Sequence, residues 1–204
     1  MQTDKISLND QGDGLAEALE AADRFAEYHD LPRRDALHVR LLTEETVGMV
    51  KAMTVDFSAL FWIEGEKDQC ELHLVAHTPM DRGKRKELLS VSSSGRNTAA
   101  RTLMGKIQEL MELGLEGIDD EQPLGSLTYG TWGIEGMETD PGSYTWSLDR
   151  YRDSVRKNRF SHDEGAPAWD ELEKSVVANL ADNIEVGIQK DKVQLTIFKR
   201  LSGR

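Results

Sequence analysis

The sequence predicts an α+β protein, a two-layer α/β sandwich in which helices cover one face of a mixed, mainly antiparallel sheet. Two segments, 59–77 and 184–199, carry apolar residues at alternate positions on both sides of a short polar turn, as β-hairpins do. Several other segments repeat their apolar residues at helical spacing. Strands and helices do not alternate strictly along the chain, which disfavours an all-parallel sheet.

The N-terminal part of the chain predicts a pair of helices. The first 13 residues, MQTDKISLNDQGD, are polar, and we expect them to form a flexible end. Apolar residues at helical spacing over 15–29 then predict a first helix. Asp35 is a suitable N-cap for a second helix, which is expected to run to about Met53.

Two hairpins are expected to join one sheet. In ALFWIEGEKDQCELHLVAHT, apolar and polar residues alternate on both sides of the turn GEKDQ. Cys70 belongs to the apolar set and is expected in the core. In IEVGIQKDKVQLTIFKRL, the same alternation surrounds the turn QKD, and a helix over 168–183 precedes this second hairpin.

The centre of the chain carries a basic segment, a loop and a helix. MDRGKRKELLS is short and basic, and the loop VSSSGRN consists mainly of small residues. The next segment, NTAARTLMGKIQELMELG, predicts an amphipathic helix that ends at Gly114. This helix and the helix over 41–53 are expected to pack on the same face of the sheet.

Residues 115–166 differ in composition from the rest of the chain. They are rich in glycine and acidic residues and have no clear helical or strand period, although SYTWSLDRYRDSVRKN predicts one more helix. Because the tryptophans and tyrosines concentrated here are too apolar for a linker, we expect a satellite core or anchors for a protein partner. We interpret the stretch as an acidic insertion in a single domain that spans residues 1–204.

The net charge of −12 and the pI near 4.9 disfavour some classes of partner. Non-specific binding to nucleic acid needs a basic surface that replaces phosphate counterions, and an anionic membrane attracts the same kind of surface. The single cysteine cannot form an internal disulfide, and no segment resembles a signal peptide or a membrane span. We therefore expect a cytoplasmic protein that binds neither nucleic acid nor membrane.

The segment LLTEETVGMV carries a resemblance to a known family. The chain also has the predicted order helix, acid-bearing helix, hairpin, small-residue loop, helix, hairpin. By this segment and this order the chain resembles the histidine-kinase-like (GHKL) ATPases, and within them the anti-sigma-factor serine kinases. In that family a glutamate lies four residues before an asparagine that holds Mg²⁺. The resemblance implies that Glu44 is the remnant of the catalytic base, and it puts Gly48 at the asparagine position. Since Gly48 has no side chain to hold a metal, we expect a weak or inactive ATPase.

The resemblance also assigns positions to the other residues of the nucleotide site. The family's adenine-binding aspartate falls near His77, and the nearest acid is Asp81. The segment TLMGKI corresponds to the phosphate-contacting helix and retains Gly105 and Lys106. The family's mobile lid corresponds to Ser92, Ser93, Ser94, Gly95, Arg96 and Asn97.

The small-residue loop also has physical features of an anion site. Backbone amides at a helix start carry partial positive charge, and Arg96 with the cations of DRGKRKE adds to it. Ser94 or Asn97 would serve equally well as an ordinary helix cap.

Several single residues have more than one interpretation. Gly48 either lets another backbone approach the helix closely, which we favour, or leaves open space for a ligand. Of Glu44 and Glu45, either one is solvated on the helix surface while the other forms an ion pair, or one is a general base. Glu44 is the better candidate for the base because it shares a helix face with Gly48. His73 and His77 share one strand face, but the sequence shows no third ligand, so we expect no metal site.

Two functions follow from the sequence. The first is a nucleotide-binding regulatory protein of the anti-sigma type, which would bind ATP or ADP with Mg²⁺ and act on a sigma factor or another regulator. The second is a degenerate member that works as a nucleotide-independent protein–protein interaction module. Formation of a homodimer is left open.

Overall fold

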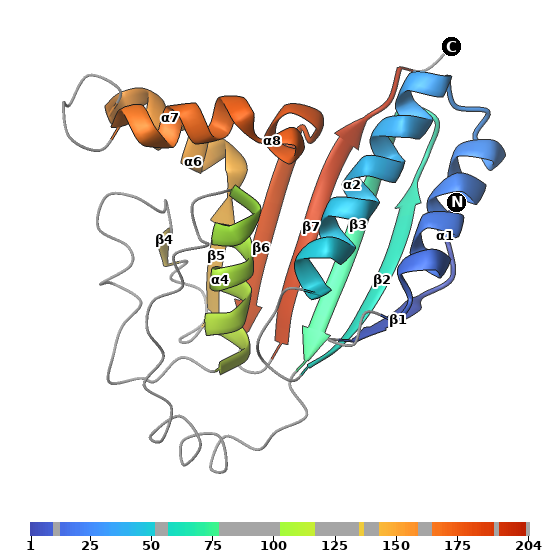
Figure 1. Cartoon of the computed structure of the whole chain (residues 1–204), viewed down its shortest axis with the longest axis horizontal. Helices are drawn as coiled ribbons and strands as arrows, with labels where there is room; N and C mark the ends of the chain where they lie inside the picture. The colour runs from blue at the N-terminus through green and yellow to red at the C-terminus, as the bar shows by residue number, and fades with distance from the viewer. Residues whose placement is uncertain are drawn as a thin grey trace.

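Figure 1 presents the computed structural model of the chain, in which helices lie in front of a single sheet. The structure describes residues 1–9, 13–51, 57–77, 103–116, 135–136, 143–158, 165–189 and 192–202. Its elements, in chain order, are β1 (Ile6–Asn9), α1 (Leu15–Tyr28), α2 (Arg33–Lys51), β2 (Ser58–Gly65), β3 (Gln69–His77), α4 (Leu103–Glu116), β4 (Glu135–Gly136), β5 (Ser143–Ser147), α6 (Leu148–Asn158), α7 (Gly165–Lys174), α8 (Val176–Leu180), β6 (Asn183–Gln189) and β7 (Lys192–Arg200).

The sheet has seven strands in the order β1-β2-β3-β7-β6-β5-β4. The two predicted hairpins, β2–β3 and β6–β7, join through the pairing of β3 with β7, which confirms that they share one sheet. We expected a mixed, mainly antiparallel sheet; every pair of strands that the structure describes is antiparallel.

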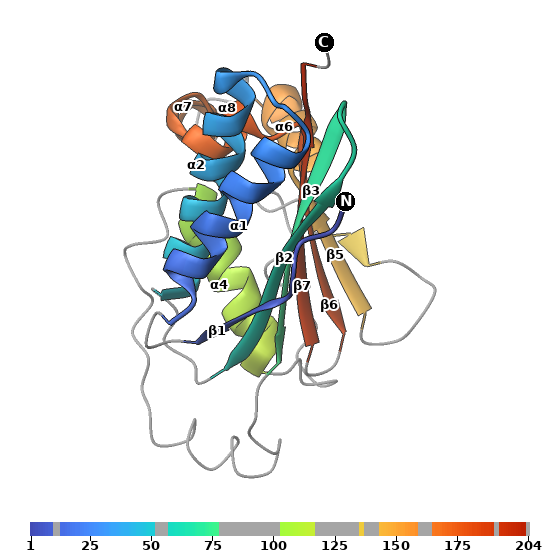
Figure 2. The ribbon, with the colours of Figure 1, turned by 90° about the vertical axis from the view of Figure 1, so that its right-hand side faces the viewer.

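The helices α1, α2, α4, α7 and α8 lie on one side of the sheet (Figure 2). The burial of the strand residues reflects this arrangement. Alternate residues of β3 (Cys70, Leu72, Leu74 and Ala76) face the helices and are buried. Helix α2 contacts α4, and both contact the sheet on the same side, as predicted. The α+β class and the helix-covered sheet are therefore confirmed.

The N-terminus is not a flexible end over the residues that the structure describes. Residues 1–9 include strand β1, whose Ile6 pairs with Phe61 and whose Asn9 pairs with Ser58 of β2. Leu8 is buried, and the Thr3 amide donates a hydrogen bond to the Ile63 carbonyl (2.8 Å). Ile6 and Leu8 supply only one short alternation, too little to stand out in a polar segment.

Asp35 is not the N-cap of the second helix. Helix α2 begins at Arg33, so Asp35 lies in its first turn and is buried at 3% exposure. Its carboxylate accepts hydrogen bonds from the Ser202 amide (2.6 Å) and the Ser202 hydroxyl (3.3 Å). Asp35 therefore fastens the C-terminal end of the chain to the start of α2.

Part of the predicted insertion is integral to the sheet and core. Residues 143–147, which we expected to be helical, form β5 and pair with β6; the predicted helix is confirmed only over 148–158. Trp146 and Tyr151 are 3% and 1% exposed and belong to the same hydrophobic cluster as the rest of the core. They do not form a separate satellite core, because Trp146 of β5 and Tyr151 of α6 both pack into the main core.

Two helix boundaries also differ from the predictions. Gly114 does not end its helix, since α4 continues to Glu116. The helix expected over 168–183 is divided into α7 and α8 at Ser175, whose hydroxyl accepts a hydrogen bond from the Ala178 amide as the cap of α8.

Candidate functional site

A cleft of about 360 Å³ lies between α2 and α4. The two helices are far apart in sequence but adjacent on the sheet (Figure 1). Among the described residues, four from α2 and three from α4 line the cleft: Glu44, Glu45, Gly48, Met49, Met104, Gly105 and Gln108. The cleft thus combines Glu44, Gly48 and Gly105, three of the residues that the sequence singled out.

Gly48 faces open space. Among the described residues, and leaving out the backbone of its own helix, a Cβ atom built on Gly48 would have no heavy atom within 4 Å. The interpretation we favoured from the sequence, that Gly48 permits close approach of another backbone, is therefore wrong. The other interpretation, that Gly48 leaves open space for a ligand, agrees with the geometry. Gly48 lines the cleft, and its missing side chain leaves the cleft wider.

Glu44 and Glu45 reach the cleft because of the helical period of α2. The face of α2 against the core contains Val39, Leu42, Val47 and Val50. Thr43 and Thr46 lie on this buried side and donate hydroxyl hydrogen bonds to the main-chain oxygens of Val39 (3.0 Å) and Leu42 (2.7 Å). The intervening Glu44 and Glu45 are exposed, and both carboxylates remain accessible to a ligand in the cleft.

Lys106 does not line the cleft, although its neighbour Gly105 does. Its Nζ atom donates a hydrogen bond to the Tyr151 hydroxyl (2.7 Å) and lies 5.0 Å from the centre of the Tyr151 ring. One residue along an α-helix rotates the side chain by about 100°, so Gly105 and Lys106 face different neighbours. The sequence suggested a common role for these two residues, and the structure separates them.

The remaining nucleotide-site candidates are not brought together by the described residues. His77 is exposed at the end of β3, where it pairs in register with Ser58 and Lys192, and it is not part of the cleft lining. Asp81 and the predicted lid, residues 92–97, lie outside the described residues.

The chemistry of the cleft follows from its lining. Two carboxylates, an amide and two thioethers are present, and no cationic side chain is among the described residues around the cleft. Carboxylate oxygens are suitable ligands for Mg²⁺, whereas a bare phosphate needs donors. The described lining therefore suits a cation, or an anion that arrives with its own cation.

Cys70 is excluded as a nucleophile by its surroundings. It is 1% exposed on the core side of β3, as predicted. Burial raises the pKa of the Cys70 thiol to about 12, so the reactive thiolate is scarce at neutral pH.

A second group of polar residues lies on the sheet face opposite the helices. The sequence offered only His73 and His77 as a metal pair, but the structure brings Glu64 and Glu71 to His73 instead. The available signal was the hairpin itself, because Glu64 and Glu71 lie at equal distances from the centre of its turn and pair across it.

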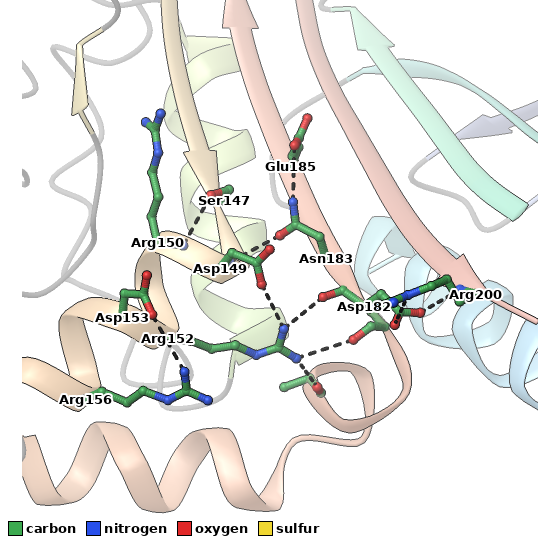
Figure 3. A network of polar contacts seen from close by, with 12 residues as sticks. Ser147, Asp149, Arg150, Arg152, Asp153, Arg156, Asp182, Asn183, Glu185 and Arg200 are labelled. Carbon is green, nitrogen blue, oxygen red and sulfur yellow. Dashed lines mark hydrogen bonds and ion pairs between the residues drawn. The ribbon is translucent and has the colours of Figure 1, made fainter. Parts of the chain in front are cut away.

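Figure 3 shows a further polar network, which holds α6, α8 and the end of β7 together. Arg152 of α6 donates hydrogen bonds to main-chain oxygens at the end of α8, those of Ala178 (2.5 Å), Ala181 (3.3 Å) and Asp182 (2.9 Å). These contacts satisfy carbonyl groups that a helix end leaves unpaired. Arg152 is thereby occupied with structural contacts.

Comparison with protein-family models, curated proteins and solved structures gives no match. Among the described helices, none is long and apolar enough to cross a membrane.

Proposed function

We propose that the protein is a nucleotide-binding regulatory protein of the histidine-kinase-like type, and that the cleft between α2 and α4 receives ATP or ADP with Mg²⁺. One observation carries the proposal: Glu44, Gly48 and Gly105, which the family resemblance assigns to one nucleotide site, line one cleft although they come from distant segments. The described elements α1, α2, β2–β3, α4 and β6–β7 follow the order of helices and hairpins on which the resemblance rests, with β1 and the elements from β4 to α8 in addition.

The lining of the cleft fits the metal better than the phosphates. Glu44 and Glu45 supply oxygen ligands of the kind that Mg²⁺ takes in proteins, usually together with water and phosphate oxygens. Gly48 adds no ligand. We therefore expect the protein to hold Mg²⁺ only weakly. Because the sequence also predicts that Arg96 and the cations of DRGKRKE contact the phosphates, we expect nucleotide binding to depend only weakly on Mg²⁺.

The same geometry supports regulation over catalysis. A general base must hold its carboxylate against the attacking group, and Glu44 is exposed on its helix. With Gly48 in place of a metal-binding side chain, hydrolysis of ATP is expected to be weak or absent. The bound nucleotide would then act through a partner in the cytoplasm, such as a sigma factor or another regulator.

Calorimetric titration of the chain with ATP and ADP, with and without Mg²⁺, tests the proposal. The Gly48→Asn variant restores the side chain that the family uses, and open space around Gly48 allows it to fit. We expect this variant to bind nucleotide more tightly with Mg²⁺ than without. Gly48→Ala is the matched control, because it adds a Cβ without a ligand atom and leaves the Mg²⁺ dependence unchanged.

Two results would overturn the assignment of the cleft. If the wild-type chain binds the Mg²⁺ complex tightly and loses it with a chelator, another residue holds the metal. If Glu44→Gln, Gly48→Asn and the wild type all fail to bind nucleotide, the cleft is not a nucleotide site.

A nucleotide-independent interaction module is the second candidate function, and the uncovered face of the sheet favours it. None of the described helices covers this face, which carries the exposed Leu60 and the partly exposed Trp62, Val75 and Phe198. Exposed apolar groups on one face are typical of interaction surfaces. A shift to a dimer in equilibrium sedimentation, without any nucleotide and reversed by Leu60→Glu, would support this candidate in the form of a homodimer.

A further inference from the structure

Glu64, Glu71 and His73 form a compact group on the sheet face opposite the helices. Glu64 pairs with Glu71 across the β2–β3 hairpin, and His73 lies two residues beyond Glu71 on the same strand. Side chains two residues apart in a strand project to the same face, and cross-strand partners do likewise. The hairpin register thus fixes all three side chains beside one another.

The distances within the group suit a small metal ion. The His73 Nε2 atom lies 3.2 Å from Glu64 Oε1 and 3.4 Å from Glu71 Oε2. All three potential ligand atoms are within 4.8 Å of one another. Around a tetrahedral Zn²⁺ with bonds of about 2.0–2.1 Å, neighbouring ligand atoms lie about 3.3 Å apart.

The His73 ring supplies an independent indication of a ligand. Its side chain is only 9% exposed, and its Nε2 atom is buried between the two carboxylates at ion-pair distance, yet among the described residues it has no contact with the geometry of a hydrogen bond. A buried polar atom without a partner is costly and rare. A cation bound between the nitrogen and the two carboxylates would satisfy all three groups.

The surroundings of His73 orient the ring for this role. Its Nδ1 atom lies 3.4 Å from the Thr196 hydroxyl, where a metal-binding histidine usually has its outer hydrogen bond. The ring also stacks on Trp62, with centres 4.9 Å apart and planes inclined by 15°. The Lys5 Nζ atom lies over the Trp62 ring, 4.6 Å from its centre.

We propose that Glu64, Glu71 and His73 bind a divalent transition-metal ion of the Zn²⁺ class. Imidazole and carboxylate ligands suit this class, and three protein ligands leave one coordination position for water or another ligand. The side chains of Glu64 and Glu71 are 42% and 36% exposed, so the ion can enter from solvent. The site lies on the opposite sheet face from the α2–α4 cleft and does not depend on the proposed nucleotide function.

The test uses the untagged chain, freed of metal by a chelator and then dialysed. Calorimetry with Zn²⁺ is expected to give one ion per chain at this site, and Co²⁺ to give the visible absorption of a four-coordinate ion. Glu64→Gln and Glu71→Gln are each expected to weaken Zn²⁺ binding at least ~10-fold. Glu66→Gln, which removes the same charge from an exposed position in the same hairpin, is the matched control and should bind as the wild type does.

A second measurement uses Trp62 as a local reporter. Cu²⁺ quenches nearby tryptophan fluorescence, and the stacking of Trp62 on His73 places it beside the ion. Saturable quenching that disappears in Trp62→Phe, while Zn²⁺ still binds that variant, supports the site. Failure of the wild type to bind Zn²⁺ or Co²⁺, or equal weakening by Glu66→Gln, would overturn the proposal and leave His73 as a neighbour of the two carboxylates with no metal ion between them.

Discussion

Lys106 of α4 donates a hydrogen bond from its Nζ atom to the Tyr151 hydroxyl of α6 across 2.7 Å. Lys106 comes from the segment that the family resemblance assigns to the nucleotide site, whereas Tyr151 comes from the stretch that we expected to be an insertion. Lys106 therefore has a structural role, because this hydrogen bond connects α6 to α4 in the helix layer.

Removal of the Tyr151 hydroxyl should destabilise the fold. Tyr151→Phe keeps the buried ring but leaves the Lys106 ammonium without this acceptor, and a hydrogen bond to a charged group is worth about 1.5–3 kcal/mol. Because Lys106 is partly exposed, we expect a loss of about 1–2 kcal/mol in urea unfolding. Asp153→Asn, which disrupts an exposed 3.7 Å ion pair with Arg156, should change the free energy of unfolding by less than about 0.5 kcal/mol. Equal stability of Tyr151→Phe and the wild type would contradict the structural role of Lys106.

Gly48 and Gly114 should respond in opposite directions to the same substitution. Both lie within helices, where alanine is favoured over glycine by about 0.5–1 kcal/mol. Among the described residues outside its own helix backbone, a Cβ on Gly48 meets nothing within 4 Å, so Gly48→Ala should raise the free energy of unfolding by about that amount. A Cβ on Gly114 would lie 2.7 Å from a methyl group of Val193 and 2.8 Å from one of Ile188, so Gly114→Ala should lose about 1–3 kcal/mol. Thermal unfolding of the two variants measures the contrast, and a stabilised Gly114→Ala would show that α4 does not pack closely on β6 and β7.

Strand β1 should contribute to stability, contrary to the flexible end predicted from the sequence. Leu8 is 1% exposed, and Leu8→Ala should cost about 2–5 kcal/mol in denaturant unfolding. Ser7, its neighbour on the opposite face of the strand, is exposed, and Ser7→Ala should change stability by less than about 0.5 kcal/mol. If both variants unfold as the wild type does, β1 is not part of the cooperative fold.

The sequence predicts elements well where one period is sustained. The long alternations of β2–β3 and β6–β7 identify both hairpins, and the apolar spacing of α4 identifies its face toward the core. Strand β1 has too few residues to establish a period, and β5 is hidden because SYTWS runs directly into the helical residues of α6. Short elements like these obtain their stability from neighbouring strands, which a local pattern does not contain.

The sequence predicted only those site residues that lie close together along the chain or match a known motif. Glu44, Gly48 and Gly105 were selected by the family resemblance, but nothing in the sequence distinguished a packed Gly48 from an open one. Lys106 was assigned to the same site as Gly105. The sequence did not reveal its contact with Tyr151, because that contact depends on how α6 docks. The group of Glu64 and His73 depends on hairpin register, and we had compared histidines only with each other.

Asp182 gives the fold a defined dependence on pH. Burial by itself raises the pKa of Asp182, but the Arg200 amide, which donates a 2.6 Å hydrogen bond, and the Lys199 and Arg200 cations outweigh it and lower the pKa below the ordinary value of 3.8. The folded state therefore favours the carboxylate form of Asp182. Its contribution to stability is fully present above the unfolded-state pKa and is lost as the pH falls through the lower folded-state pKa.

This sign predicts how the Asp182→Asn variant differs from the wild type. The variant should be less stable at pH 7, and the difference should persist down to about pH 4–5 and shrink below it, as the wild-type carboxylate becomes protonated. Urea unfolding at a series of pH values measures this difference. Asp170→Asn on α7, which removes an exposed ion pair with Lys174, should differ little from the wild type across the series. If the difference in the free energy of unfolding between Asp182→Asn and the wild type stays constant into strong acid, the charge of the Asp182 carboxylate does not stabilise the contact between the start of β6 and the end of β7.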